Sequence, residues 1–346
     1  MVFRFSAMGD VAMTVPVLKT LLDTNPELEI IMVSRSFFAP LFNGIPRLTF
    51  VGVDLKNQYK LKNQYKGVAG LYRLFKELKT FQPDYIADLH DVLRTKILRF
   101  FFSVSGYKIA VIDKGRAEKK ALVRAQNKVF KPLLSTHERY AGVFRRLGYQ
   151  LNLEDYQPAL PPLSAQVRLF LDNFQGQKII GIAPFAAHKG KQYPLDKIEK
   201  VVQMLLEKDE EVNILLFGGG KEEKKKMDEL EKINRNRIVN TAEVFDFEEE
   251  LQLISRLKLM FSMDSANGHL AAIYGVPVIT VWGVTHPYAG FAPLHQPVEN
   301  QIIPDLNRFP QLPLSVYGNK TFERMEQMWE TIEPEMIVDK ILPIIN

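Results

Sequence analysis

The chain has 346 residues, of which 46% are hydrophobic and 25% charged, which is the composition of an ordinary globular protein. It contains no cysteine, which excludes disulfides, thiolate metal sites and a cysteine nucleophile, and predicts a reducing, cytoplasmic location. The sequence has no run of about 18 apolar residues, so we predict no transmembrane helix. No leader with a basic and then an apolar stretch is recognisable, so we predict no signal peptide.

The net charge of +5 is unevenly distributed. Residues 1–160 carry 25 Lys and Arg against 14 Asp and Glu, whereas the remainder carries 20 against 26. A basic half predicts an anionic partner: nucleic acid, an acidic membrane surface or a phosphorylated glycan. No RNA-binding or zinc-finger motif is recognisable, so we expect no nucleic acid. A solvated surface with no specific partner is the alternative.

In the first part of the chain, short β-rich runs alternate with helical ones. The pattern predicts strands at 1–5, 28–34, 48–54, 83–90 and 107–113. It predicts helices at 11–25, 37–45, 67–81, 91–104 and 136–149. The pentapeptide Lys-Asn-Gln-Tyr-Lys occurs twice in a predicted basic loop at 56–66. A second basic stretch follows at 115–131, and a proline-rich linker is predicted at 151–164.

The alternation then restarts, with strands predicted at 178–185, 212–220, 238–242, 258–264 and 276–283. Helices are predicted between and after them, at 194–208, 221–234, 247–257, 267–275 and 322–344. Repeated βα units predict parallel sheets with helices on both faces, here an α/β fold with domains at 1–160 and 161–346. Sites in open α/β sheets lie beyond the carboxyl ends of the strands, so we expect the chemistry in the strand-to-helix loops.

The first such loop is "SAMGD". Ser6, Met8 and Gly9 form a tight turn, and Asp10 lies where the helix begins. An aspartate is favoured there because it caps the helix and complements its dipole. A carboxylate at the edge of a cleft can also take a proton from an attacking hydroxyl. The residues of this loop alone leave both roles open.

A second loop, within residues 261–287, has the character of an anion site. Asp264 ends a buried strand, and the small residues after Ser265 turn into the next helix. The free N–H groups at a helix start, together with His269 in the first turn, predict phosphate binding. A purely structural role for the histidine is the alternative.

Two more loops of the second half offer ligand contacts. Lys191 follows a strand and is suited to neutralise a leaving diphosphate, unless it is an ordinary exposed lysine. Gly218 belongs to a glycine triplet that lets a backbone approach a ligand, and Glu222 or Glu223 is placed to accept ribose hydroxyls. The triplet fits neither a dinucleotide fingerprint nor a Walker loop, and a flexible turn is its alternative.

The basic half has its own candidates. His90 and Arg94 follow a predicted strand, and Arg116 and Lys119 belong to the basic stretch after the next strand. We predict that they hold an anionic acceptor, with a solvated basic face as the alternative. The six histidines are scattered and no Asp-x-Asp pair occurs, so we expect no metal site. The Gly-x-Ser-x-Gly motif is absent, so we predict no hydrolase triad.

Taken together, four motifs resemble glycosyltransferase family 9, whose best-known members are the bacterial lipopolysaccharide heptosyltransferases. They follow the family order and read "FSAMGDVAMTVP", "GKQYP", "FGGGKEE" and "SMDSANGHLAAIYGVPVITVWGVTHP". The chain departs from the family at Ala266, where glycine is usual, and at Tyr193, where tryptophan is frequent. The resemblance implies a GT-B fold, with two Rossmann-like parallel-sheet domains facing a central cleft. The acceptor would bind the N-terminal domain and the nucleotide sugar the C-terminal one, with the C-terminal helix free to pack back on the N-terminal domain.

The resemblance also implies an inverting, metal-independent transferase without a cofactor. It would move a heptose from ADP-heptose to an anionic lipid A–core saccharide. The basic half of the chain predicts that it contacts this acceptor and that it holds the enzyme on the inner leaflet of the cytoplasmic membrane. Asp10 would be the general base, and Lys191 would stabilise the leaving diphosphate. The remaining donor contacts would be Gly218, Glu222, Asp264, Ser265, Ala266 and His269. The alternatives are an epimerase-like enzyme of the same fold and a non-catalytic nucleotide-sugar or glycan-binding protein.

Overall fold

The computed structural model describes residues 1–53 and 65–346, which form two compact units. Unit 1 comprises Met1–Lys114 and Thr136–Gln157, and unit 2 comprises Gly115–Ser135 and Pro158–Asn346. The sequence boundary at 160 differs from this division at Gly115–Ser135 and at residues 158–160, both of which group with unit 2. Most of the predicted basic loop at 56–66 lies outside the described residues.

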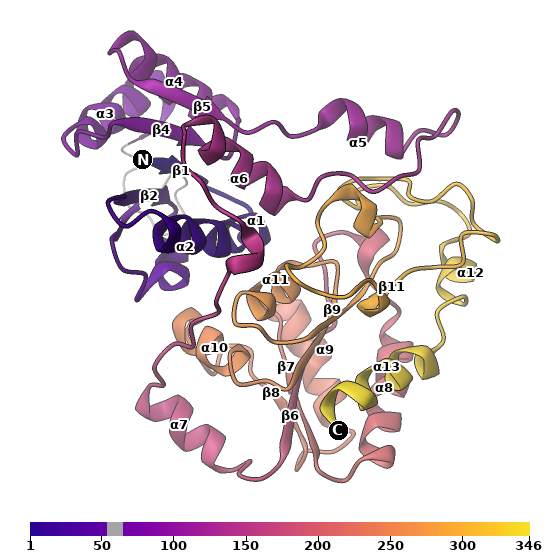
Figure 1. Ribbon diagram of the computed structural model, residues 1–346. Helices are drawn as coiled ribbons and strands as arrows, with labels where there is room; N and C mark the ends of the chain where they lie inside the picture. Colours follow the sequence, from indigo (N-terminus) through magenta and orange to yellow (C-terminus); the bar gives the residue numbers. More distant parts are fainter. Residues whose placement is uncertain (54–64) are drawn as a thin grey trace. The chain divides into compact units, whose positions relative to one another are not determined.

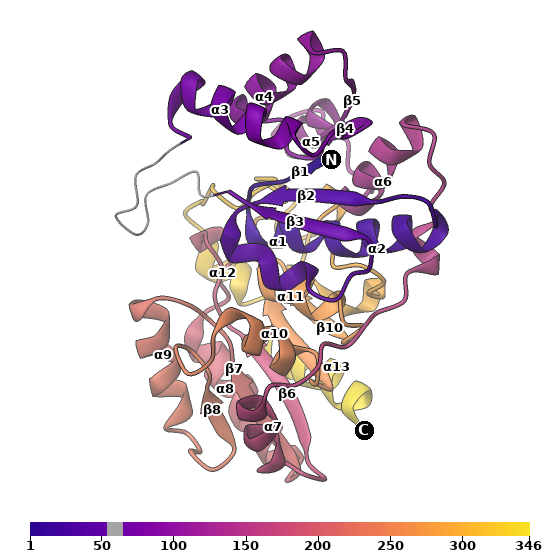
Figure 2. The same cartoon turned by 90° about the vertical axis from the view of Figure 1, so that its left-hand side faces the viewer.

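Unit 1 is built on a five-stranded parallel sheet with the order β3-β2-β1-β4-β5 (Figures 1 and 2). The first strand lies in the centre, so the direction of strand addition reverses between β1 and β4. This reversal is the topological switch point, where open α/β sheets bind their ligands. The strands are β1 (Val2–Phe3), β2 (Ile30–Ser34), β3 (Leu48–Gly52), β4 (Tyr85–Asp88) and β5 (Lys108–Val111).

The helix predicted at 11–25 begins earlier and is broken at Met13. The hydroxyl of Thr14 donates to the carbonyl of Val11 over 2.7 Å at this break. Pro16 then lies in the first turn of the following helix, where its missing N–H removes no helical hydrogen bond. The helices of unit 1 are α1 (Met8–Ala12), α2 (Thr14–Thr24), α3 (Gly67–Lys79), α4 (Leu93–Val104) and α6 (Thr136–Arg146), with a 3₁₀ turn η1 (Ser36–Phe42) and η2 (Leu153–Asp155).

Unit 2 has a six-stranded parallel sheet with the order β11-β10-β9-β6-β7-β8. Its switch point lies between β6 and β9, because the strands after β6 add on one side and those from β9 on the other. Five strands were predicted, whereas the two-residue β11 follows a long irregular stretch and was not. The strands are β6 (Lys178–Ala183), β7 (Val212–Leu216), β8 (Ile238–Asn240), β9 (Leu259–Met263), β10 (Val278–Val281) and β11 (Gln301–Ile302).

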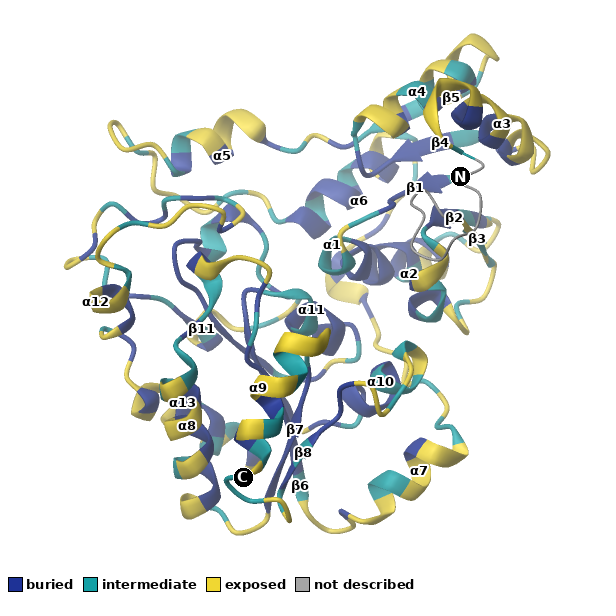
Figure 3. Ribbon diagram, turned by 180° about the vertical axis from the view of Figure 1, so that it is seen from behind, coloured by how far each residue is buried: buried dark blue, intermediate teal, exposed yellow. Residues whose placement is uncertain are grey.

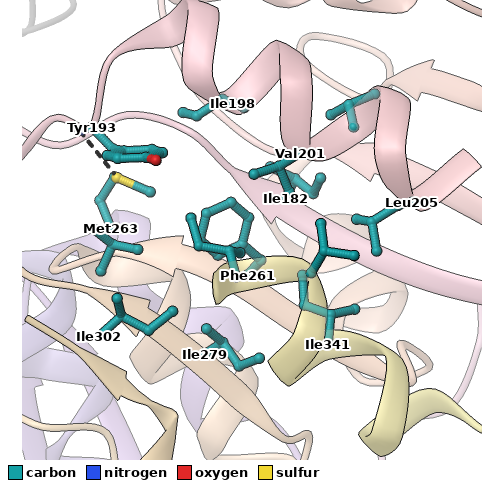
Figure 4. Packing of buried hydrophobic residues seen from close by; sticks show 14 of the residues in the cluster. Ile182, Tyr193, Ile198, Val201, Leu205, Phe261, Met263, Ile279, Ile302 and Ile341 are labelled. Carbon is teal, nitrogen blue, oxygen red and sulfur yellow. Dashed lines mark hydrogen bonds between the residues drawn. The ribbon is translucent and has the colours of Figure 1, made fainter. Parts of the chain in front are cut away.

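The core of unit 2 lies between its sheet and two helices, α8 (Leu195–Lys208) and α13 (Pro334–Ile345). Phe261 of β9, Val201 of α8 and Ile341 of α13 are fully buried there (Figure 4). The sequence analysis allowed the C-terminal helix to pack on the N-terminal domain. In the structure this helix is α13, which groups with unit 2 and packs in its core. Figures 1 and 2 show the helices of this unit, which are α5 (Arg116–Leu122), α7 (Ala165–Asp172), α8 (Leu195–Lys208), α9 (Lys221–Glu231), α10 (Phe247–Ile254), α11 (Ala266–Ala272), α12 (Met325–Trp329) and α13 (Pro334–Ile345), with short turns η3 (Lys189–Lys191), η4 (Pro287–Ala289) and η5 (Val298–Asn300).

The segment Gly115–Ser135 is held in unit 2 by polar and aromatic contacts. The ammonium of Lys128 donates to the carbonyls of Gln311 and Leu312 over 2.5 and 2.7 Å. The N–H of Leu133 donates to the carbonyl of Tyr288 over 2.9 Å. These long-range contacts, invisible in a linear pattern, explain why the segment departs from the domain predicted for it.

The predicted fold class is confirmed, since two all-parallel α/β sheets are present. Across the described ranges, no helix is long and apolar enough to cross a membrane.

Candidate active site

Asp10 lies at the switch point of unit 1. It is the third residue of α1, and its Oδ2 accepts the N–H of Ala7 over 3.3 Å. The same oxygen is 2.6 Å from an Nη atom of Arg4, and the Asp10 side chain is 27% exposed. Asp10 thus stabilises the helix start and still presents carboxylate surface to solvent, so the two roles left open by the sequence are compatible.

Arg4 was missed by the sequence analysis. It directly follows β1, its side chain is 7% exposed, and it donates to the carbonyl of Leu89 over 2.8 Å. Its guanidinium lies 5.7 Å from the ring centre of Tyr140, whose hydroxyl donates to the Asp10 carbonyl over 3.2 Å. The available signal was a lone cation inside the apolar run "MVFRF", where a buried charge needs a partner.

The loop after β4 is fixed beside this pair by a fully buried carboxylate. Asp88 accepts the N–H groups of His90 and Asp91, each over 2.9 Å. The Nδ1 of His90 accepts the N–H of Phe5 over 3.4 Å. Burial, followed by the charges of Arg4 and nearby cations, lowers the pKa of His90 to about 3. At neutral pH His90 is therefore an uncharged ring beside the Asp10 loop.

The acceptor residues predicted from the sequence are divided between the units. Ser6, Met8, Gly9, His90 and Arg94 belong to unit 1. Arg116 and Lys119 lie on α5 and group with unit 2. The Lys119 side chain is buried, and its Nζ lies 4.0 Å from the ring centre of Phe291.

At the switch point of unit 2, Lys191 pairs with Asp264. The Lys191 Nζ lies 2.8 Å from Asp264 Oδ2 and donates to the Asp264 carbonyl over 3.3 Å. The hydroxyl of Thr285, after β10, donates to the same Oδ2 over 2.8 Å. The Lys191 side chain is 16% exposed and that of Asp264 is 7% exposed. Two loops that the sequence offered separately thus meet, because β6 and β9 are neighbours.

A glycine makes this meeting possible. A Cβ on Gly190 would lie 2.5 Å from the side chain of Val284 and 2.8 Å from the carbonyl of Gly318. The Gly190 carbonyl accepts the N–H of Val284 over 2.8 Å. Only glycine fits so close a crossing, which sets Lys191 at the strand ends.

The loop after β9 leads directly into α11. Ser265 occupies the cap position, and its Oγ is buried with no hydrogen-bond partner among the described residues. Ala266 is the first helical residue, where alanine fits the right-handed backbone well. His269 is 7% exposed. The substitution of the usual family glycine therefore causes no backbone strain.

The two candidate glutamates after β7, Glu222 and Glu223, differ in their hydrogen bonding and exposure. Glu223 accepts the N–H of Gly219 over 2.9 Å, whereas Glu222 is exposed at the start of α9. A Cβ on Gly218 would lie 3.0 Å from the Met227 side chain, so this loop packs tightly on its own helix. Glu222 is consequently the glutamate with side-chain surface available to a ligand.

His286 was also missed, although it lies in the quoted motif. It is 3% exposed, and its Nδ1 accepts the N–H of Tyr288 over 3.1 Å. Its ring packs on that of Phe130, at 5.0 Å between centres. Burial and the charge of Lys128 lower the pKa of His286 to about 4, so it is neutral at pH 7.

No group of three or more His, Asp or Glu side chains is placed to hold a metal ion within the described part of the chain.

Two units, each built on a parallel α/β sheet, are the building blocks of the GT-B fold, and each sheet here has a charged pair at its switch point. The model of glycosyltransferase family 9 (heptosyltransferase) matches residues 71–311. The chain belongs to glycosyltransferase family 9, as the sequence motifs predicted.

Individual relatives are distant. The chain is 22% identical over 290 residues to the lipopolysaccharide core heptosyltransferase OpsX of Haemophilus influenzae, covering 83% of this chain and 79% of OpsX. A family 9 glycosyltransferase from Veillonella parvula has a similar fold, with a TM-score of 0.71 at 16% identity, covering 99% of this chain and 96% of that one. The heptosyltransferase WaaC of E. coli, solved with ADP, gives a TM-score of 0.66 at 17% identity, covering 99% and 98%.

Proposed function

We propose that the protein transfers a heptose from ADP-heptose to a phosphorylated lipopolysaccharide core saccharide, with inversion at the anomeric carbon. One observation carries the chemistry: each switch point holds an ion pair whose more exposed member suits one half of a glycosyl transfer. Family membership and the activities named for the relatives support the choice of sugar and acceptor.

In this proposal Asp10 is the general base. An acceptor hydroxyl is a poor nucleophile at neutral pH, and Asp10 removes its proton as the oxygen bonds to the anomeric carbon. Arg4 holds the accepting carboxylate and Tyr140 holds its backbone, which fixes the direction of proton transfer. After transfer, Asp10 returns the proton to water.

In the same step Lys191 stabilises the group that leaves the anomeric carbon. The bond between that carbon and the diphosphate breaks, and the electron pair leaves with the ADP oxygen. The Lys191 ammonium, positioned by Asp264 and Thr285, stabilises the departing charge. Glu222 contacts the nucleoside ribose, while Ser265, Ala266 and His269 line the diphosphate. Charge neutralisation by a lysine removes the need for a metal ion at the diphosphate.

The test is to incubate the protein with ADP-heptose, with and without a heptose-deficient core acceptor, and to measure ADP and product. We expect ADP release only with acceptor, an inverted linkage, and unchanged turnover in EDTA. Isomerised ADP-heptose without acceptor would favour an epimerase. Donor binding in a thermal-shift assay without turnover would favour a binding protein.

A further inference from the structure

Helix α4 carries apolar side chains on two faces. Leu98 and Phe102 face the core of unit 1 and are fully buried. Leu93, Phe100 and Val104 are 74%, 61% and 68% exposed. Their spacing of seven and four residues places these three on one side of the helix, in an outer stripe that runs its full length.

The fold alone does not require this stripe. The comparable helix α8 of unit 2 also packs on a sheet, and all of its exposed positions are polar: Asp196, Glu199, Lys200, Gln203, Glu207 and Lys208. That is the normal pattern for a surface helix. A contiguous apolar patch on such a helix marks an interaction surface.

Helix α3 extends the patch. Val68 and Tyr72, one turn apart, are 60% and 44% exposed. The Tyr72 ring lies 5.2 Å from that of Phe101, which lies 5.8 Å from that of Phe100. Figure 2 shows α3 and α4 side by side, and Figure 3 shows exposed residues along both. We call the outer side of these two helices, defined by Val68, Tyr72, Leu93, Phe100 and Val104, the α3–α4 face.

The charge of the two helices is strongly positive. Lys76 lies with its Nζ 5.0 Å from the ring centre of Tyr72. The Lys96 side chain is 49% exposed, and its Nζ lies 3.8 Å from the carboxylate of Asp91. The one acidic residue of α3 and α4, Glu77, accepts the hydroxyl of Tyr65. The two helices carry six basic residues, namely Arg73, Lys76, Lys79, Arg94, Lys96 and Arg99. Arg99 is 17% exposed and pairs with Asp88 and Asp91 before α4, so the positive charge offered to solvent comes from the other five.

We propose that the α3–α4 face docks unit 1 onto the surface of an anionic phospholipid bilayer. Exposed leucine, phenylalanine and valine enter the boundary between headgroups and acyl chains, while the lysines and arginines contact anionic headgroups. A nucleic acid would contact the basic residues through its phosphates but would leave the apolar stripe without a partner. A second copy of this face would meet its own positive charge. The inference goes beyond the transfer reaction and does not depend on which sugar is moved.

The main test is vesicle flotation of the full chain. We expect binding to vesicles of phosphatidylcholine mixed with phosphatidylglycerol, weak binding to phosphatidylcholine alone, and release at high salt. The triple variant Leu93→Ser, Phe100→Ser, Val104→Ser should lose binding about tenfold or more. The matched control is Leu169→Ser with Val298→Ser, because these side chains of unit 2 are 71% and 70% exposed.

Charge is tested separately. Lys76→Gln and Lys96→Gln should each weaken binding about fivefold, as expected for one basic residue near an anionic surface. A thermal melt of each variant, compared with the unchanged chain, establishes that the fold is retained.

Insertion of the α3–α4 face into the bilayer is measured by the tryptophan fluorescence of the Phe100→Trp variant. The two natural tryptophans, Trp282 and Trp329, are 1% and 4% exposed and should not respond to vesicles. We expect a blue shift of the new tryptophan on adding anionic vesicles. The proposal is overturned by no vesicle binding, by a folded triple variant that still floats, or by unchanged emission in the bound state. A dimer that the triple variant dissociates, without vesicle binding, would assign the face to self-association.

Discussion

The two switch points carry the same kind of ion pair with opposite exposure. At β1/β4 the cation is buried, since Arg4 is 7% exposed, and the carboxylate of Asp10 is 27% exposed. At β6/β9 the carboxylate of Asp264 is 7% exposed and the Lys191 cation 16%. In each pair the buried member fixes the position of the accessible one. The first site therefore presents an acceptor of protons and the second a counter-charge for an anion.

The largest expected effect is on the exposed carboxylate. Asp10→Asn keeps the size of the side chain and removes the base, so transfer should fall by about 100-fold or more. Affinity for ADP, measured by calorimetry, should remain unchanged because the proposed donor site belongs to unit 2. Asp23→Asn is the matched control, since Asp23 pairs with Lys19 on the surface of α2. Near-normal transfer by the Asp10 variant would remove it as the base.

The next effect concerns the exposed cation. Lys191→Gln keeps a hydrogen-bond donor and removes the charge, so affinity for ADP should weaken about 30-fold, within the range for hydrogen bonds to charged groups. Calorimetry with ADP measures this directly. Lys189→Gln, at an exposed neighbouring position, should change nothing. Equal affinities for all three proteins would separate Lys191 from the diphosphate.

Arg4 tests whether a buried partner positions its carboxylate. Arg4→Met should lower kcat about tenfold through misplacement of Asp10, with the KM for donor unchanged. Arg4→Lys, which keeps the charge but cannot reach both Asp10 and Leu89 in one plane, should restore part of the loss. Steady-state kinetics distinguish this from a structural role, which would lower the melting temperature without splitting kcat from KM.

A separate prediction concerns stability in acid, and one histidine in each unit reports it. His90 and His286 have pKa values lowered to about 3 and about 4 in the folded chain, from 6.5 when unfolded. Each group favours the folded state fully above pH 6.5 and loses that contribution as the pH falls towards its folded value. Between pH 7 and pH 5 the loss is about 2 kcal/mol for each histidine.

Chemical denaturation at those two pH values checks it. His90→Asn and His286→Asn should each flatten the pH dependence, whatever their effect on absolute stability. A slope equal to that of the unchanged chain would mean that the histidine titrates normally in the fold.

Local patterns were sufficient to predict the alternation of strands and helices and the loops that hold Asp10, Lys191 and Asp264. Parallel sheets force functional loops to the carboxyl ends of strands, so a strand pattern predicts where those loops lie. Arg4 was not found because it interrupts an apolar run, and its partners lie six and 85 residues away. The placement of Gly115–Ser135 depends on contacts with residues beyond 280, which no window of the sequence contains.

That segment has a consequence for how the molecule is divided. Because Gly115–Ser135 belongs to unit 2 while its neighbours on both sides belong to unit 1, the chain passes between the units three times. A gene cut at residue 160 would give an N-terminal fragment that carries part of the other unit, with Lys128 and Phe130 deprived of their partners. Neither unit is a contiguous stretch of chain, so no single cut separates them, and each half-molecule has to be assembled from two segments.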